Sequence, residues 1–242
     1  MKTFLRTSFL IVFLTMNFWL LAQTSMPVMV FKEDPLTHNM HIASDGQYLY
    51  TCNGGLPDKG QISKFTLTGE KIGSYKFELD MRSIMFNPSD KKLYVSTYGK
   101  KIYRINDVVM GSYSEIMTFD DRDGQSTPAF DAKGKYLCFY EDGKVFMYDW
   151  KKGKLKKTLE GLHLIQGAPD QSVAIAMDAR HIYTWNANDQ LILAYDLKGN
   201  HEKTFKVNQG NYIFSLSVAN GLVWVSTDGN YEVGTWYGYR LW

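Results

Sequence analysis

The sequence predicts an all-β protein built from five repeated, four-stranded sheets. The first observation is that an apolar or aromatic pair recurs five times, at steps of 44, 44, 45 and 41 residues. The second is a turn with Asp, Asn or Gly before each pair, and the third is that no amphipathic helical pattern of useful length is visible. The repeated pairs are Leu49-Tyr50, Leu93-Tyr94, Leu137-Cys138, Ile182-Tyr183 and Val223-Trp224.

Each unit is expected to contain four strands. A first strand rich in small residues leads into the polar turn, and the second strand carries the apolar pair. A third apolar strand follows, as at residues 62–65, and a fourth is polar and lysine-rich, as at residues 154–159. Lysine on an exposed outer strand discourages pairing with another chain, so we interpret these charges as edge protection. A period of about 40–45 residues with four strands is typical of one propeller blade.

The fifth unit ends at its third strand, because Tyr239 falls at the position that Phe65 has in the first unit and the sequence ends at Trp242. Residues 28–32 precede the first unit and have the composition of the missing fourth strand. Pairing the two ends of the chain leaves no open sheet edge at the seam. The sequence therefore predicts a five-bladed β-propeller of four-stranded antiparallel blades, closed by an N-terminal strand that completes the last blade.

Residues 1–22 have the pattern of a secretory signal peptide: Lys2 and Arg6, then an apolar run at residues 9–21, with no acidic residue. An uncleaved membrane anchor needs about 18–20 apolar residues, and this run is interrupted by Thr15 and Asn17. We therefore expect cleavage after Ala22, a propeller domain at residues 23–242, and a periplasmic or secreted monomer without a membrane span.

The charge of the domain argues against nucleic acid as a partner. The full chain has 27 basic and 25 acidic residues, and removing Lys2 and Arg6 leaves 25 of each. Phosphate binding needs a basic surplus that is concentrated on one face.

The two cysteines are expected to stay reduced. Cys52 and Cys138 fall in corresponding strands of the first and third units. Two blades that are not neighbours cannot bring their Cα atoms within about 7 Å of each other, as a disulfide requires. The sequence predicts two buried free thiols.

The repeat units resemble the degenerate repeats of the broad propeller superfamily that includes YVTN, NHL and WD-repeat-like proteins. The resemblance covers residues 25–242, although the Gly-His and Trp-Asp signature of true WD repeats is absent. It implies the fold and a ring-shaped surface, and no particular ligand.

Loops at one end of the ring supply the candidate binding residues, because function concentrates on loops that a rigid framework holds. Two loops are long, at residues 53–60 and 227–235, and they belong to the first and fifth units, which become neighbours when the ring closes. The alternative interpretation is that both loops only stabilise the seam. The candidates are Asn53, Asp58, Lys59, Arg82, Tyr98, Glu141, Asn211, Tyr212, Asp228, Tyr231 and Glu232.

No metal or cofactor is expected. His38 and His41 stand three residues apart, but the sequence fixes no Cys or carboxylate partner, so we interpret them as structural. The acidic run at residues 120–124 does not match the alternating pattern of a calcium loop, and no c-type haem attachment motif is present.

Two functions remain open, and the first is a non-catalytic binding protein that recognises a protein or a glycan through its loop face. No set of nucleophile, base and orienting acid recurs in the sequence, and no catalytic residue is assigned.

The alternative is a propeller enzyme, either glutaminyl-cyclase-like or a glycan hydrolase or lyase. Residues 49–56 are similar to the first-blade segment of plant-type glutaminyl cyclases. Those enzymes carry an acid in a Gly-Glu-Gly segment, and the resemblance ends there, because this chain has Glu78-Leu79-Asp80 and Glu78 or Asp80 would have to replace that acid without the flanking glycines. A glycan hydrolase would need two carboxylates about 5–10 Å apart, drawn from Glu78, Asp80, Asp123 and Glu141.

Overall fold

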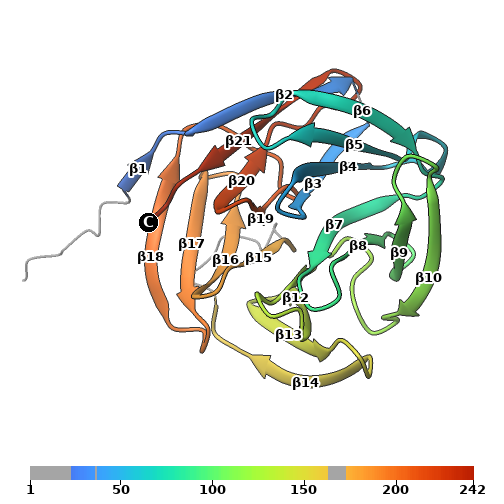
Figure 1. Cartoon of the computed structure of the whole chain (residues 1–242). Coiled ribbons are helices and arrows are strands. Elements are labelled where there is room, and N and C mark those ends of the chain that lie inside the picture. The colour runs from blue at the N-terminus through green and yellow to red at the C-terminus, as the bar shows by residue number, and fades with distance from the viewer. Residues whose placement is uncertain (1–22, 36, 163–172) are drawn as a thin grey trace, which may run out of the picture.

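The computed structural model describes residues 23–35, 37–162 and 173–242, which form a ring of five sheets (Figure 1). Apart from β1, neighbouring strands of each sheet are antiparallel and run from an inner strand to an outer one. This arrangement confirms the predicted five-bladed β-propeller. The predicted signal peptide, residues 1–22, lies outside the described residues.

Blades 1 to 3 each consist of four consecutive strands. Those of blade 1 are β3 (His38–Ser44), β4 (Tyr48–Gly54), β5 (Gln61–Thr66) and β6 (Lys71–Lys76). Those of blade 2 are β7 (Met81–Asn87), β8 (Lys92–Thr97), β9 (Lys101–Asp107) and β10 (Ser112–Thr118). Those of blade 3 are β11 (Ala129–Phe130), β12 (Tyr136–Glu141), β13 (Lys144–Asp149) and β14 (Lys154–Leu159). One 3₁₀ turn, η1 (Pro57–Lys59), is the only helical element among the described residues.

The last blade closes the ring with a strand from the other end of the chain. Blade 5 contains β19 (Ser217–Ala219), β20 (Leu222–Ser226), β21 (Val233–Tyr239) and β2 (Met29–Pro35). β2 is antiparallel to β21, with Val30 opposite Tyr237 and Phe31 opposite Trp236. The predicted closure by residues 28–32 is thereby confirmed.

Blade 4 has a fifth strand that the sequence did not predict. Its own strands are β15 (Ile175–Met177), β16 (His181–Asn186), β17 (Leu191–Asp196) and β18 (His201–Val207). Outside them lies β1 (Gln23–Ser25), which is parallel to β18 (Figure 1). The N-terminal segment therefore covers the outer edges of two neighbouring blades.

A repeated contact explains why the polar turn and the aromatic pair recur together. In blade 1 the Asp45 carboxylate accepts bonds from the backbone N–H groups of Gln47 and Tyr48, both at 2.8 Å, and from the Tyr50 hydroxyl at 2.8 Å. The equivalent hydroxyl–carboxylate pairs are Tyr94 with Asp90, at 2.8 Å, and Tyr183 with Asp178, at 2.7 Å. The tyrosine ring can therefore enter the core because its hydroxyl is paired.

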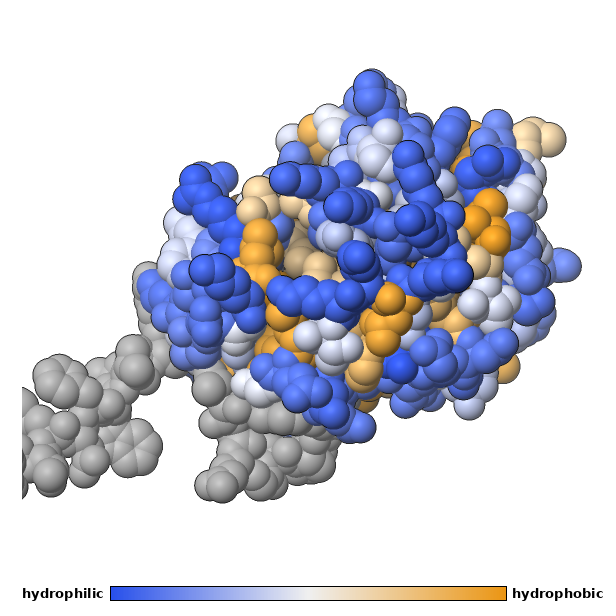
Figure 2. All heavy atoms as spheres, turned by 90° about the horizontal axis from the view of Figure 1, so that it is seen from below, coloured by the Kyte–Doolittle hydropathy of each residue, from blue (hydrophilic) through white to orange (hydrophobic). Residues whose placement is uncertain are grey.

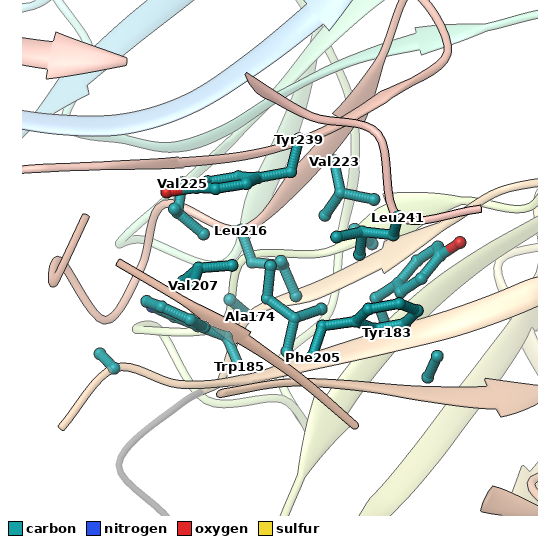
Figure 3. Close-up of a cluster of buried hydrophobic side chains, with 14 residues drawn as sticks. Ala174, Tyr183, Trp185, Phe205, Val207, Leu216, Val223, Val225, Tyr239 and Leu241 are labelled. Carbon is teal, nitrogen blue, oxygen red and sulfur yellow. The ribbon is translucent and has the colours of Figure 1, made fainter. Parts of the chain in front are cut away.

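Apolar side chains fill the wedges between neighbouring blades. Between blades 4 and 5, Tyr183, Trp185 and Phe205 pack with Val223 and Tyr239 (Figure 3). Full burial of a large apolar side chain contributes about 1.5–3 kcal/mol. These wedges fix the blades relative to one another, and so they fix the loops at the two ends of the ring.

Cys52 in β4 and Cys138 in β12 are both free and buried, as the sequence predicted. Burial raises the pKa of each thiol because a thiolate is poorly solvated in the core. Both cysteines therefore act as small apolar core residues.

The outer surface is mixed in character. Figure 2 shows a side of the molecule where hydrophilic residues cover most of the surface and apolar residues lie in patches between them. Among the described residues, no helix has the length and apolar character that crossing a membrane requires.

Candidate functional site

The two long loops lie at the seam, where blade 5 meets blade 1, and they border one pocket. The loop face is the end of the ring where second strands connect to third strands and outer strands connect to the next inner strand. On this face, the loop after β4 and the loop after β20 enclose a pocket of about 460 Å³. Its lining, which we call the seam pocket, consists of Pro35, Thr37, Asp58, Lys59, Gly60, Gln61, Lys76 and Tyr231.

Asn53 shapes the first of these loops from inside. Its amide nitrogen donates to the Thr37 hydroxyl and to the Lys59 carbonyl, both at 2.9 Å. Its amide oxygen accepts the backbone N–H of Gln61 at 2.6 Å. Asn53 is fully buried, so it holds η1 in place and leaves Asp58 and Lys59 at the pocket.

The second loop presents an aromatic ring. It is pinned at its base by the bond from the Thr227 N–H to the Thr235 carbonyl, at 3.0 Å. Within it, Asn230 and Tyr231 have φ values of 39° and 71°, and the Glu232 N–H donates to the Gly229 carbonyl at 2.7 Å. This turn leaves the Tyr231 residue 61% exposed beside the seam pocket.

His38 and Asp228 form a pair next to the pocket. The Nδ1 atom of His38 lies 2.9 and 3.1 Å from the two carboxylate oxygens of Asp228. The His38 ring stacks on Tyr212, with ring centroids 5.7 Å apart and planes 13° from parallel. Burial, and then the charge of Asp228, raise the pKa of Tyr212, so this phenol stays neutral. The His38 imidazole is therefore oriented by its contact with the Asp228 carboxylate and by stacking on the Tyr212 ring.

Asp80 and Arg82 form a second pair on the loop face, at the connection from β6 to β7. Arg82 donates from Nη1 and Nη2 to the Asp80 carboxylate, at 2.9 and 3.3 Å, and its guanidinium carbon lies 5.0 Å from the Tyr98 ring centroid. The Gly55 N–H donates to Asp80 at 2.7 Å. A Cβ at Gly54 would overlap the backbone carbonyl of the residue before Arg82. The tight approach of this loop to Arg82 therefore requires glycine.

Glu141 has a different role in blade 3. Its carboxylate accepts the Asp123 backbone N–H at 2.9 Å, the Ser126 hydroxyl at 2.7 Å and Arg122 Nη1 at 3.0 Å. The Arg122 guanidinium carbon also lies 3.8 Å from the Phe146 ring centroid. Glu141 therefore anchors the loop between β10 and β11.

The predicted site residues fall into groups. Asp58, Lys59 and Tyr231 line the seam pocket, with Glu232 next to Tyr231 in the chain. Arg82, Tyr98, Tyr212 and Asp228 take part in the two pairs described above. Asn211 has an exposed side chain and donates its backbone N–H to the Ser226 carbonyl at 3.0 Å. Asn53 and Glu141 hold loops, and ligand contact by the rest stays a prediction.

Sequence reasoning named Asp228 and Tyr212 but did not connect them with His38. His38 begins the first inner strand, and Asp228 lies 190 residues later. The signal that could have found the pair is ring closure, which places the blade 5 loop beside the start of blade 1.

The four carboxylates that a hydrolase could use have separate partners. Glu78 has a side chain that is 75% exposed and lies 3.6 Å from Lys76, and Asp80 is held by Arg82. The Asp123 carboxylate accepts the Gln125 N–H at 2.8 Å. Among the described residues, no hydrogen bond joins two of these carboxylates directly, and the Asp123 backbone N–H bonds to the Glu141 carboxylate.

The two histidines diverge in the structure. While His38 meets Asp228 at the rim, His41 faces inward and its Nδ1 lies 2.7 Å from the Ile84 carbonyl oxygen. Burial lowers the pKa of His41 to about 4, so it is neutral at physiological pH. No group of three or more His, Cys, Asp or Glu side chains that could hold a metal ion occurs in the described part of the chain.

The ring of five blades defines a five-bladed β-propeller protein. No protein-family model matches the sequence, and no curated protein matches it. Among solved structures, the glutaminyl cyclase of Myxococcus xanthus is similar, with a TM-score of 0.67 over 90% of this chain and 97% of that chain. The two sequences are 9% identical, so the similarity establishes the fold alone.

Proposed function

We propose that this chain is a periplasmic or secreted, non-catalytic binding protein that recognises a protein or a glycan through its loop face. The observation that carries this proposal is the seam pocket of about 460 Å³, bordered by both long loops. Ligand sites are typically concavities of about 300–1,000 Å³ with a few polar groups that fix orientation. Asp58, Lys59 and Gln61 supply such groups, and Tyr231 supplies an exposed ring.

The state of the carboxylates supports a binding role over catalysis. A general acid or base must come within hydrogen-bonding reach of the substrate. Asp80 already accepts bonds from Arg82 and Gly55, and Glu141 accepts three bonds that hold its own loop. Both carboxylates therefore hold neighbouring segments of the protein in place.

The test is a capture experiment with residues 23–242. The protein is immobilised and exposed to a glycan array and to solubilised envelope proteins of the source organism, beside Tyr231→Ala. We expect a ligand that the wild type retains and that Tyr231→Ala releases. Equal retention of the ligand by the wild type and Tyr231→Ala would show that the ligand binds outside the seam pocket.

A glutaminyl-cyclase-like enzyme is the second candidate, and one local arrangement favours it. Gly55 bonds to Asp80, and a Cβ at Gly55 would lie 2.8 Å from the His38 ring. An acid and an oriented imidazole therefore flank the segment that is similar to the cyclases.

The discriminating assay for this candidate is ammonia release from a peptide with N-terminal glutamine. Our proposal of a binding protein predicts no release above the blank. Release that is lost in Asp80→Asn would establish the enzyme instead.

A further inference from the structure

We propose that the seam pocket binds a neutral glycan. This inference rests on the proposed function and selects one ligand class for it. Four properties of the pocket support this ligand class: its charge, its hydrogen-bonding groups, its exposed ring and its composition.

The charges at the pocket are balanced. Asp58 and Lys59 are adjacent in η1 and offset one another. Lys76 lies 3.6 Å from Glu78, a carboxylate just outside the lining. A phosphorylated or acidic ligand needs a local surplus of cations, which this pocket does not offer. A ligand without net charge fits better.

The lining offers donors and acceptors side by side. Lys59 and Lys76 are donors, the Asp58 carboxylate is an acceptor, and the Gln61 amide has both kinds of atom. A sugar hydroxyl donates one hydrogen bond and accepts two, so it can use mixed groups of this kind. A chain of hydroxyl groups is therefore a better match than an apolar ligand.

Tyr231 adds a flat surface at the mouth of the pocket. Asn230 and Tyr231 have left-handed φ values, which are uncommon for residues with a Cβ, and Tyr231 is 61% exposed in this turn. The face of an aromatic ring is electron-rich and attracts polarised C–H groups, which one side of a sugar ring presents. The exposed ring and the polar lining together fit the two kinds of surface on a sugar.

The composition argues against a protein as the occupant. The buried centres of protein interfaces are depleted of Lys, Asp and Glu, and they are enriched in aromatic residues, Met and Arg. In the seam pocket Asp58, Lys59 and Lys76 surround a single aromatic ring. A concavity of about 460 Å³ also encloses a small ligand better than it accepts a broad protein surface.

The experiment screens residues 23–242 against an array of neutral glucans, mannans, xylans and chitooligosaccharides, together with acidic glycans. Hits are titrated by calorimetry with the wild type, Tyr231→Ala, Tyr231→Phe and Met110→Ala. Met110 is an exposed apolar residue in the β9–β10 turn, at the other end of the ring, and serves as the matched control. Thermal melting establishes that each variant is folded.

We expect a neutral glycan whose Kd rises at least about tenfold in Tyr231→Ala and changes less than about threefold in Tyr231→Phe and Met110→Ala. The Kd should change little between roughly 50 mM and roughly 500 mM salt, because a neutral ligand has no charge to screen.

Three outcomes would overturn the inference. Selective binding of acidic glycans, weakened by salt, would show that charge drives recognition. A protein partner that depends on Tyr231, with no glycan bound, would refute the glycan assignment but leave the proposed function standing. If neither a glycan nor a protein binds, both the glycan assignment and the proposed function are refuted.

Discussion

Glu33 in β2 accepts a hydrogen bond from the Thr51 hydroxyl in β4, so a carboxylate of the closing strand reaches from blade 5 into blade 1. Glu33 is 3% exposed. Burial raises its pKa, and the surrounding hydroxyl groups and Lys71 offset this only in part. The seam beside the candidate pocket therefore contains a buried carboxyl group with a raised pKa.

This contact makes ring closure sensitive to pH. A carboxyl group with a raised folded-state pKa contributes stability that is fully present in acid and is lost as the pH rises through the folded pKa. Glu33→Gln stays neutral at every pH. We expect the variant to be more stable than the wild type at alkaline pH and similar to it in acid, as measured by urea midpoints across the pH range. A variant that is less stable throughout would contradict this account.

Phe31 tests the packing of the closing strand. Its ring centroid lies 4.6 Å from that of Phe65 and 5.5 Å from that of Trp224. Phe31→Ala should lower the free energy of unfolding by about 3–5 kcal/mol, because it leaves a cavity in the seam. Val30, on the opposite side of the same strand, is 52% exposed, and Val30→Ala should change stability by about 0.5 kcal/mol or less. Similar losses in both variants would refute the assigned register.

Gly54 tests the close approach of the first seam loop to Arg82. A Cβ there would meet the Met81 carbonyl and lie 2.7 Å from Arg82 Nη1. We expect Gly54→Ala to cost about 1–3 kcal/mol in chemical denaturation, because the loop or Arg82 must shift. Gly99→Ala is the control, since its Cβ would have one neighbour, at 3.8 Å. Equal losses of unfolding free energy in Gly54→Ala and Gly99→Ala would contradict a tight approach at Gly54.

The burial of the two cysteines can be tested by titration with a thiol reagent. A thiol reagent needs access to the thiolate, and Cys52 and Cys138 are buried with raised pKa values. Neither should react in the native protein, whereas both should react in denaturant without prior reduction. A cysteine that reacts with the reagent only after a reductant has been added would indicate a mixed disulfide.

The N-terminus of the protein isolated from its source organism tests the predicted signal peptide. Cleavage after Ala22 would leave Gln23, the first residue of β1, at the new terminus. Intact-mass measurement of the protein recovered from its native compartment should match residues 23–242. Recovery of the full-length chain in membranes would instead indicate an anchor.

The fold was predictable because its determinants are local and repeated. The contact between the Asp45 turn and Tyr50 recurs in blades 2 and 4, and the spacing of the five apolar pairs gives the number of blades. β1 was not predictable, because Gln23–Ser25 is short and polar, and its parallel backbone pairing with β18 leaves no pattern in the sequence.

The candidate site was predictable only in outline. Ring closure brings Asp58 and Tyr231 to the lining of one pocket, and ligand contact by either residue stays a prediction. It did not reveal that Asn53 is buried or that Glu141 holds its own loop, because an amide or carboxylate near a strand end can face inward or outward. The contact between His38 and Asp228 depends on side-chain directions that the spacing of residues does not encode.

The N-terminal arm, β1 and β2, joins the circumference of the ring, where it completes blade 5 and extends blade 4. Each hydrogen bond that it makes there could be reproduced by the same arm of a second copy, since the receiving strands β18 and β21 would be identical. Detachment of this arm would therefore allow two rings to exchange arms and form an intertwined dimer with unchanged blades. Variants with a lengthened or weakened arm would favour this exchange at high protein concentration.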